Sequence, residues 1–178
     1  SNVEINAGDS IYIFVSVAID PSLTGLPFIV EDSIRVNYNG NEKYVWLQAF
    51  GQNAHFLRNY FIDTDTTWTN DLPYVISGGI QVAQNSTLTI EKGCRIYLHA
   101  DAPVIVDGTL IVNGMVTSPV SFQGDRLDPA YRNLPASWPG IYFRKNSISN
   151  FIQYGVIKNA HQGITVVAPA VNALPKLA

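Results

Sequence analysis

The 178-residue sequence has little of what metal-binding and redox proteins depend on. Cys94 is its one cysteine, so neither an internal disulfide nor a cysteine-based zinc cluster can form. The three histidines, His55, His99 and His161, are scattered and share no ligand spacing. Gly78-Gly79 lacks the helix and lysine of a phosphate-binding loop. We therefore expect no metal, no cofactor and an inert, buried thiol at Cys94.

Charge is also scarce, and long apolar runs are absent. Charged residues make up 14% of the chain, the net charge is −3, and no run of lysine and arginine offers a basic face for nucleic acid. No stretch approaches the ~18 consecutive apolar residues of a membrane span. Apolar residues reach 47%, which argues against disorder. The chain opens without a methionine and ends without a stop signal for a fold, so we expect a fragment of a longer protein.

What is present is strand periodicity, which predicts an all-β protein. Apolar residues recur at spacing two, with turn formers between the runs. Residues 1–67 are typical of a small antiparallel unit, similar to a β-sandwich. Alternating residues around Ile11 and Ile13 indicate one strand. Asn39-Gly40, between two alternating runs, predicts a hairpin because both residues tolerate positive φ.

From residue 68 the pattern changes to short apolar triplets that end at polar or glycine corners. Leu88 and Leu110 are 22 residues apart, a recurrence that one coil of a parallel β-helix requires. We therefore predict a short, truncated right-handed parallel β-helix over residues 68–178. A second antiparallel sandwich is the alternative. The triplets are 80–82, 88–90, 96–98, 104–106, 110–112, 120–122, 141–143 and 164–166.

The triplets also predict which side chains point inward. The outer two residues of each triplet face the interior and the middle one faces outward, because side chains alternate along a strand. Val104 is thus expected inside and Ile105 outside. Similar spacings, of 24 and 22 residues, suggest that Ile96-Tyr97-Leu98 stacks on residues 120–122 and that Val82 stacks on Val104.

Later runs in the chain follow the successive steps of a coil, at residues 88–99, 104–114, 119–126, 138–142 and 150–154. In these runs, and over about residues 72–167, the chain resembles the right-handed parallel β-helix surface proteins of Gram-negative bacteria. In the runs 30–34, 39–41 and 45–49, the first third is similar to the immunoglobulin-like segment that precedes the β-helix in such proteins. The resemblance implies an extracytoplasmic protein at the cell surface or secreted, often lipid-anchored and of mostly unassigned function.

A long insertion between two triplets, residues 124–140, is the first place to look for a binding site. Long loops on a rigid scaffold often carry function, and aromatic residues together with Arg and Asp suit contacts to a sugar or a protein. The alternative is a connecting loop in which Trp138 fills a gap. Carboxylates at corners, such as Asp101 and Asp107, more often stabilise turns. The candidate binding residues are Asp125, Arg126, Tyr131, Arg132 and Trp138.

Two hypotheses for function follow. The leading one is a non-enzymatic structural or adhesive module of a bacterial surface protein, whose partner is a glycan or another surface protein. The alternative is a carbohydrate-binding or carbohydrate-active β-helix protein. The last triplet, with Ile164 and Val166, leaves a coil edge uncapped, so we also expect self-association through the C-terminal end.

Overall fold

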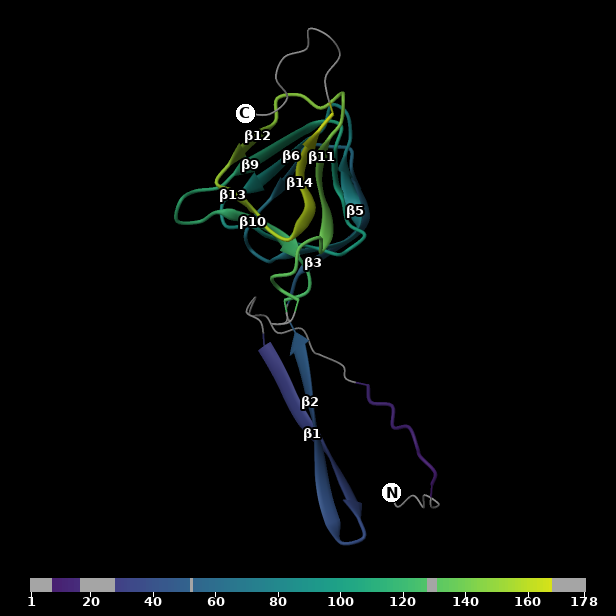
Figure 1. The fold of residues 1–178 in the computed structure, drawn as a ribbon. Coiled ribbons are helices and arrows are strands. Elements are labelled where there is room, and N and C mark those ends of the chain that lie inside the picture. The colour runs from purple at the N-terminus through teal and green to yellow at the C-terminus, as the bar shows by residue number, and fades with distance from the viewer. Residues whose placement is uncertain (1–7, 17–27, 52, 128–130, 168–178) are drawn as a thin grey trace. The chain divides into compact units, whose positions relative to one another are not determined.

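The computed structural model describes residues 8–16, 28–51, 53–127 and 131–167 (Figure 1). All regular secondary structure in these ranges is β, as the sequence predicted. The chain divides into two compact units, Ser1–Gln52 and Asn53–Ala178.

The first unit contains the predicted hairpin. Strand β1 (Phe28–Tyr38) pairs in antiparallel fashion with β2 (Asn41–Gly51), and Tyr38 faces Asn41 across the turn. The turn residues Asn39 and Gly40 have φ values of 46° and 74°, the positive values that a two-residue hairpin turn needs. Residues 9–16, where alternation predicted a strand, form none. In the described part of this unit the hairpin is the only sheet.

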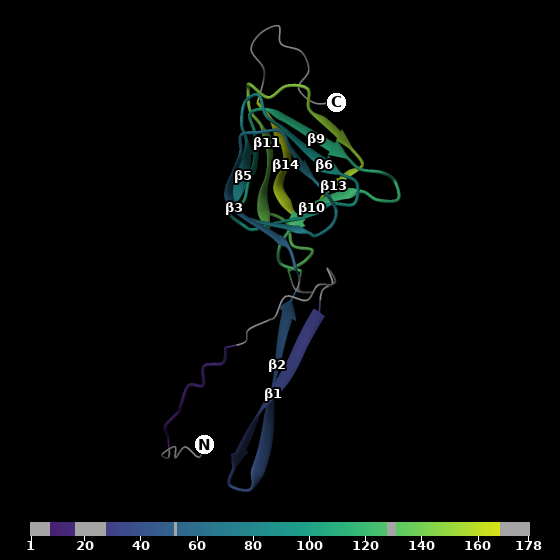
Figure 2. The ribbon, with the colours of Figure 1, turned by 180° about the vertical axis from the view of Figure 1, so that it is seen from behind.

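The second unit is a parallel β-solenoid of about five coils, with its strands arranged on three faces (Figures 1 and 2). The first face consists of the first halves of β3 (His55–Ile62) and β5 (Tyr74–Val82), then β7 (Arg95–Leu98), β10 (Val120–Gly124) and β13 (Gly155–Ile157). The second face consists of the second halves of β3 and β5, then β8 (Val104–Val106), β11 (Trp138–Phe143) and β14 (Ala160–Val166). The third face consists of β4 (Thr66–Trp68), β6 (Thr87–Glu91), β9 (Thr109–Asn113) and β12 (Phe151–Gln153).

The solenoid begins earlier than the change of pattern at residue 68. β3 and β4 pair in parallel with β5 and β6, so both belong to the solenoid although β3 and the first two residues of β4 lie within residues 1–67. Spacing two is the same in an antiparallel strand and in a solenoid coil, so alternation alone does not distinguish the two. No repeat in sequence marks β3 as the first coil.

The stacking register agrees with the sequence in part. Leu88 and Leu110 are partners, as their spacing of 22 predicted. The other two predicted pairings are wrong by two residues, because Ile96 pairs with Phe122 and Val82 pairs with Val106. A small turn bridged by Met115 and Ser118 lengthens one coil, and the corner between β7 and β8 lengthens the other. A shift of two keeps every side chain on its own side.

The inside–outside assignment is confirmed. Val104 and Val106 are at most 1% exposed, while Ile105 between them is only partly covered. The second face thus builds two buried columns, one residue per coil, and each buried apolar side chain contributes roughly 1.5–3 kcal/mol. The columns run Ile80, Val104, Ile141 and Val82, Val106, Phe143.

A glycine corner separates the first and second faces. β5 bends at Gly78 and Gly79, whose φ values are 68° and 97°. A Cβ on Gly79 would lie 2.7 Å from the carbonyl oxygen of Pro103, and one on Gly78 would collide with the side chain of Asn59. The amide of Gly78 donates to Asp101 Oδ1 over 2.9 Å. Asp101 therefore stabilises the corner, as expected for a carboxylate in a turn.

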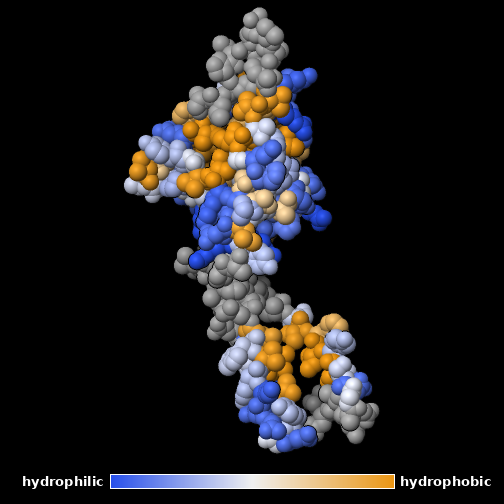
Figure 3. Space-filling view, in the orientation of Figure 1, coloured by the Kyte–Doolittle hydropathy of each residue, from blue (hydrophilic) through white to orange (hydrophobic). Residues whose placement is uncertain are grey.

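The last coil continues these columns but leaves them exposed. Ile164 stacks on Ile141 and Val166 on Phe143, yet Ile164 is 41% exposed and Val166 is 44% exposed. Figure 3 shows apolar side chains gathered over the region of β12, β13 and β14. Among the described residues, no further coil covers the interior of the solenoid at this end.

Candidate functional site

The insertion between β10 and β11 brings together some of the residues that the sequence singled out. The guanidinium of Arg126 lies over the ring of Tyr131, 4.0 Å from its centroid, which is a cation–π contact. Arg132 is exposed on the same segment. Asp128 lies outside the described residues. An exposed stacked pair of this kind can contact a ligand, but it does not enclose one.

Trp138 is placed differently from the other four candidates. Its side chain is 1% exposed, and its indole N–H donates to the carbonyl of Lys158 over 2.9 Å. The residue therefore fills the interior of the solenoid, which is the packing role that the sequence left open as an alternative. A side chain at this depth does not reach a partner.

Asp125 forms a polar pair with a residue of the preceding coil. Its Oδ2 lies 2.7 Å from Nδ1 of His99, and both groups are partly exposed. The hydrogen bond and charge of Asp125 raise the pKa of His99 above its ordinary value, and Asp101 adds to this. The pair joins two successive coils. Because protonated His99 carries a positive charge, the surface around the pair becomes more positive in acid.

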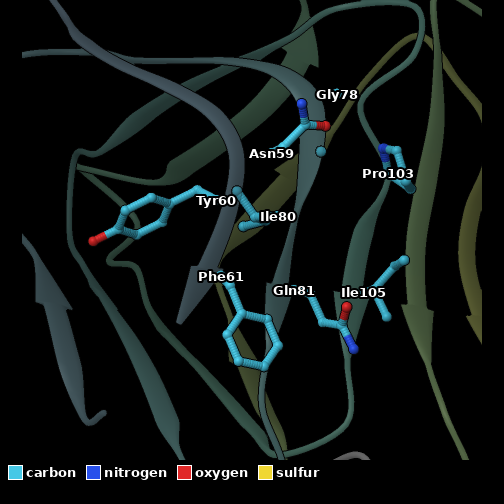
Figure 4. A pocket seen from close by; sticks show the side chains of 9 residues that line it. Asn59, Tyr60, Phe61, Gly78, Ile80, Gln81, Pro103 and Ile105 are labelled. Carbon is cyan, nitrogen blue, oxygen red and sulfur yellow. The ribbon is translucent and has the colours of Figure 1, made fainter. Parts of the chain in front are cut away.

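A second and larger candidate lies on the outer surface of the second face. The outward residues of successive coils are Phe61 on β3, Gln81 on β5, Ile105 on β8 and Tyr142 on β11. Figure 4 shows Phe61, Gln81 and Ile105 side by side on one side of the sheet. Phe61 is 55% exposed. We call this surface, with the hollows beside it, the outer groove.

The outer groove is made of three adjoining hollows of about 180, 340 and 440 Å³. The first hollow begins at the glycine corner and shares Pro103 and Ile105 with the second. The second shares Arg144 and Val167 with the third. The groove therefore crosses the second face from its first coils to the corner after β11.

The two ends of the outer groove differ in chemistry. Among the described residues, none that lines the first hollow is charged, whereas the last hollow is lined by Asp107, Arg144, Lys145 and Asn146, with Val167. Oδ2 of Asp107 accepts a 2.7 Å hydrogen bond from Gln81 and lies 3.4 Å from the guanidinium of Arg144. The charged end is thus built on a carboxylate that orients an amide and a guanidinium.

Ring orientation in the groove is also fixed. The hydroxyl of Tyr142 donates to the carbonyl of Pro139 over 3.2 Å. Tyr142 is flanked along its strand by Ile141 and Phe143, both fully buried. A ring held in this way loses little entropy when a ligand stacks on it.

The outer groove was not predicted from the sequence, because the predicted binding site was the longest loop. The signal was nevertheless present: Gln81, Ile105 and Tyr142 are the middle residues of three predicted triplets. Their common face could be assigned from parity, but their neighbourhood depends on stacking register. Nothing in the sequence pointed to Phe61, because β3 was not recognised as part of a solenoid coil.

A further cluster of polar and aromatic side chains lies in the first coils. The ring of Tyr74 stacks on that of Trp68, with centroids 4.3 Å apart, and on that of His55, with centroids 4.7 Å apart. Asp71 lies 3.0 Å from His55 and accepts a hydrogen bond from Thr69, which holds the pKa of Asp71 below its ordinary value. Burial raises the pKa of Tyr74. These contacts pack the first coils against one another.

Other chemistry is limited in the described ranges. Cys94 is fully buried, and burial raises the pKa of its thiol to about 11, so the predicted buried thiol is confirmed. No group of three or more metal-ligating His, Cys, Asp or Glu side chains occurs among the described residues. Nor does this part of the chain contain a helix long and apolar enough to cross a membrane.

Comparison with known proteins gives no relative: no family model, no curated protein and no solved structure matches the chain.

Proposed function

We propose that this chain is a non-enzymatic, adhesive module of a bacterial surface protein, working outside the cytoplasm. The outer groove carries the proposal. It places Phe61, Ile105 and Tyr142 on the outside of a sheet whose inner columns are buried from β5 to β11. Exposed apolar surface of this kind marks an interaction site, and a rigid scaffold lowers the entropic cost of binding. The resemblance to β-helix surface proteins supports the location.

A carbohydrate-binding or carbohydrate-active protein is the second candidate, and the aromatic residues of the outer groove favour it. Sugar hydrolysis usually needs two carboxyl groups on either side of the scissile bond. Asp107 is the only carboxylate among the described residues that line the groove, and it is engaged with Gln81 and Arg144. This arrangement favours binding over cleavage.

Binding and turnover should be measured on the same preparation. The purified chain is applied to arrays of glycans and of bacterial and host surface proteins, and each ligand that it retains is then incubated with it and analysed for products. We expect saturable binding without new products. Release of cleaved ligand in proportion to the chain added would overturn the non-enzymatic proposal.

Matched variants locate the binding surface. Phe61→Ala with Tyr142→Ala removes two rings from the outer groove, while Phe56→Ala removes an exposed ring, 73% accessible, from the first face of the same strand β3. The double variant should lose binding and the control should retain it, with all melting temperatures close to that of the parent chain. Equal binding by the double variant and the control would exclude the outer groove as the binding surface.

A further inference from the structure

We infer that the outer groove binds an acidic saccharide, with the sugar rings on its apolar part and a carboxylate of the sugar at Arg144 and Lys145. The inference rests on the proposed function and deepens it. It starts from the joined hollows, which share residues and so offer one elongated surface to an elongated ligand. A surface of this shape suits a chain of rings better than a single small molecule.

The apolar part of the groove matches sugar rings in spacing and chemistry. Neighbouring strands lie about 4.8 Å apart, so Phe61, Gln81, Ile105 and Tyr142 on four successive coils span about 14 Å. A short oligosaccharide covers that length. The C–H faces of its rings can pack on Phe61 and Tyr142, and the amide of Gln81 lies between these apolar contacts to meet hydroxyl groups.

The far end of the groove argues for a negatively charged ligand. Arg144 and Lys145 supply two positive charges against the single carboxylate of Asp107, in a chain whose net charge is −3. The side chain of Arg144 stays 48% exposed while Asp107 orients it, and Lys145 is also exposed. A guanidinium that a carboxylate orients, and whose side chain is still partly exposed, can donate further hydrogen bonds to a ligand.

The test compares two ligands that differ only in charge. An oligogalacturonate trimer and its fully methyl-esterified form present the same rings, one acidic and one neutral. We expect the chain to bind the acid at least about tenfold more tightly than the ester at low salt, and the difference to shrink as salt rises. Equal affinities for acid and ester would overturn the inference.

Variants separate the charged end from the rings. Lys145→Gln and Arg144→Gln should each weaken binding of the acid by about tenfold and weaken binding of the ester by a smaller factor. Lys158→Gln, which removes a positive charge outside the groove, serves as the control and should leave both affinities unchanged. If the Lys158 variant weakens acid binding as much as the groove variants do, the charge acts at long range and the assigned site is wrong.

Failure of the inference can be distinguished from failure of the proposed function. If another ligand is bound through Phe61 and Tyr142 without preference for acids, the adhesive function stands and the acidic saccharide is excluded. If ligands are bound only in a way that the Phe61 and Tyr142 substitutions do not affect, both fail.

Discussion

The first and last coils of the solenoid contain the same kind of triplet but are covered to different degrees. Ile62 on β3 and Val166 on β14 lie in one column, and their exposed fractions are 2% and 44%. In the first two coils the rings of Trp68 and Tyr74 stack on each other, and both are buried. Tyr60 is the exception there, at 41% exposed, and it lines the outer groove. The position of its coil in the stack therefore decides how much an inward residue contributes to the stability of the solenoid.

The largest expected effect on stability lies in the middle of the solenoid. There, whether a side chain points inward or outward should decide how much stability its substitution costs. Val104→Asp buries an unpaired charge in the third coil and should cost several kcal/mol, about 4 or more. Ile105→Asp, one residue away and outward, should cost about 1 kcal/mol or less. Chemical denaturation measures both. Equal losses would refute the assignment of inside and outside.

Removing inward side chains at the two ends should give the next largest effect. Trp68→Ala removes a ring that is 4% exposed and should cost about 3–5 kcal/mol. Ile164→Ala removes a side chain that is 41% exposed and should cost about 1 kcal/mol. Thermal and chemical unfolding compare them directly. A larger loss at Ile164 than at Trp68 would show that the last coil is covered in solution.

The open last coil also leads us to propose that the chain self-associates through it. Ile164 and Val166 expose apolar surface, and among the described strands β14 has β11 as its only neighbour. Sedimentation velocity at increasing concentration should show an oligomer. Val166→Lys should shift it to monomer, whereas Val116→Lys, at an apolar residue 74% exposed near the Met115–Ser118 turn, should not. A strictly monomeric parent chain at high concentration contradicts the proposal.

The smallest expected effect concerns the coil-to-coil pair of His99 and Asp125. The raised pKa of His99 means that its contribution to stability is complete below the ordinary value of 6.5 and is lost as the pH rises through the raised value. Asp125→Asn should lower the pKa of His99, measured by NMR titration of the ring. The pair is exposed, so stability should change little. An unchanged pKa would show that the two groups are apart in solution.

Much of the fold could be predicted from the sequence, because solenoid coils repeat a short pattern. Strand triplets, their parity and the hairpin at Asn39-Gly40 followed from spacing two and from turn residues. The exact register did not, since corners of variable length separate the triplets. The first coil was missed because β3 carries the same alternation as a hairpin strand.

Less of the candidate site could be predicted. The insertion supplied the Arg126–Tyr131 pair, but Trp138 turned inward because the strand that contains it belongs to the core. The outer groove depends on which outward residues become neighbours. Phe61 and Tyr142 are 81 positions apart in the numbering, and only the stacking of four coils brings them onto one surface.

Parallel stacking also determines how the solenoid would respond to a pulling force, which the proposed adhesive function would require it to resist. Each coil is held by its neighbours and uses 22 residues between Leu88 and Leu110 or 26 between Ile96 and Phe122. A coil that peels from the end would release about 75–90 Å of extended chain while the coils behind it stay folded. The module would then lengthen in steps, so that a tether stretches before it fails.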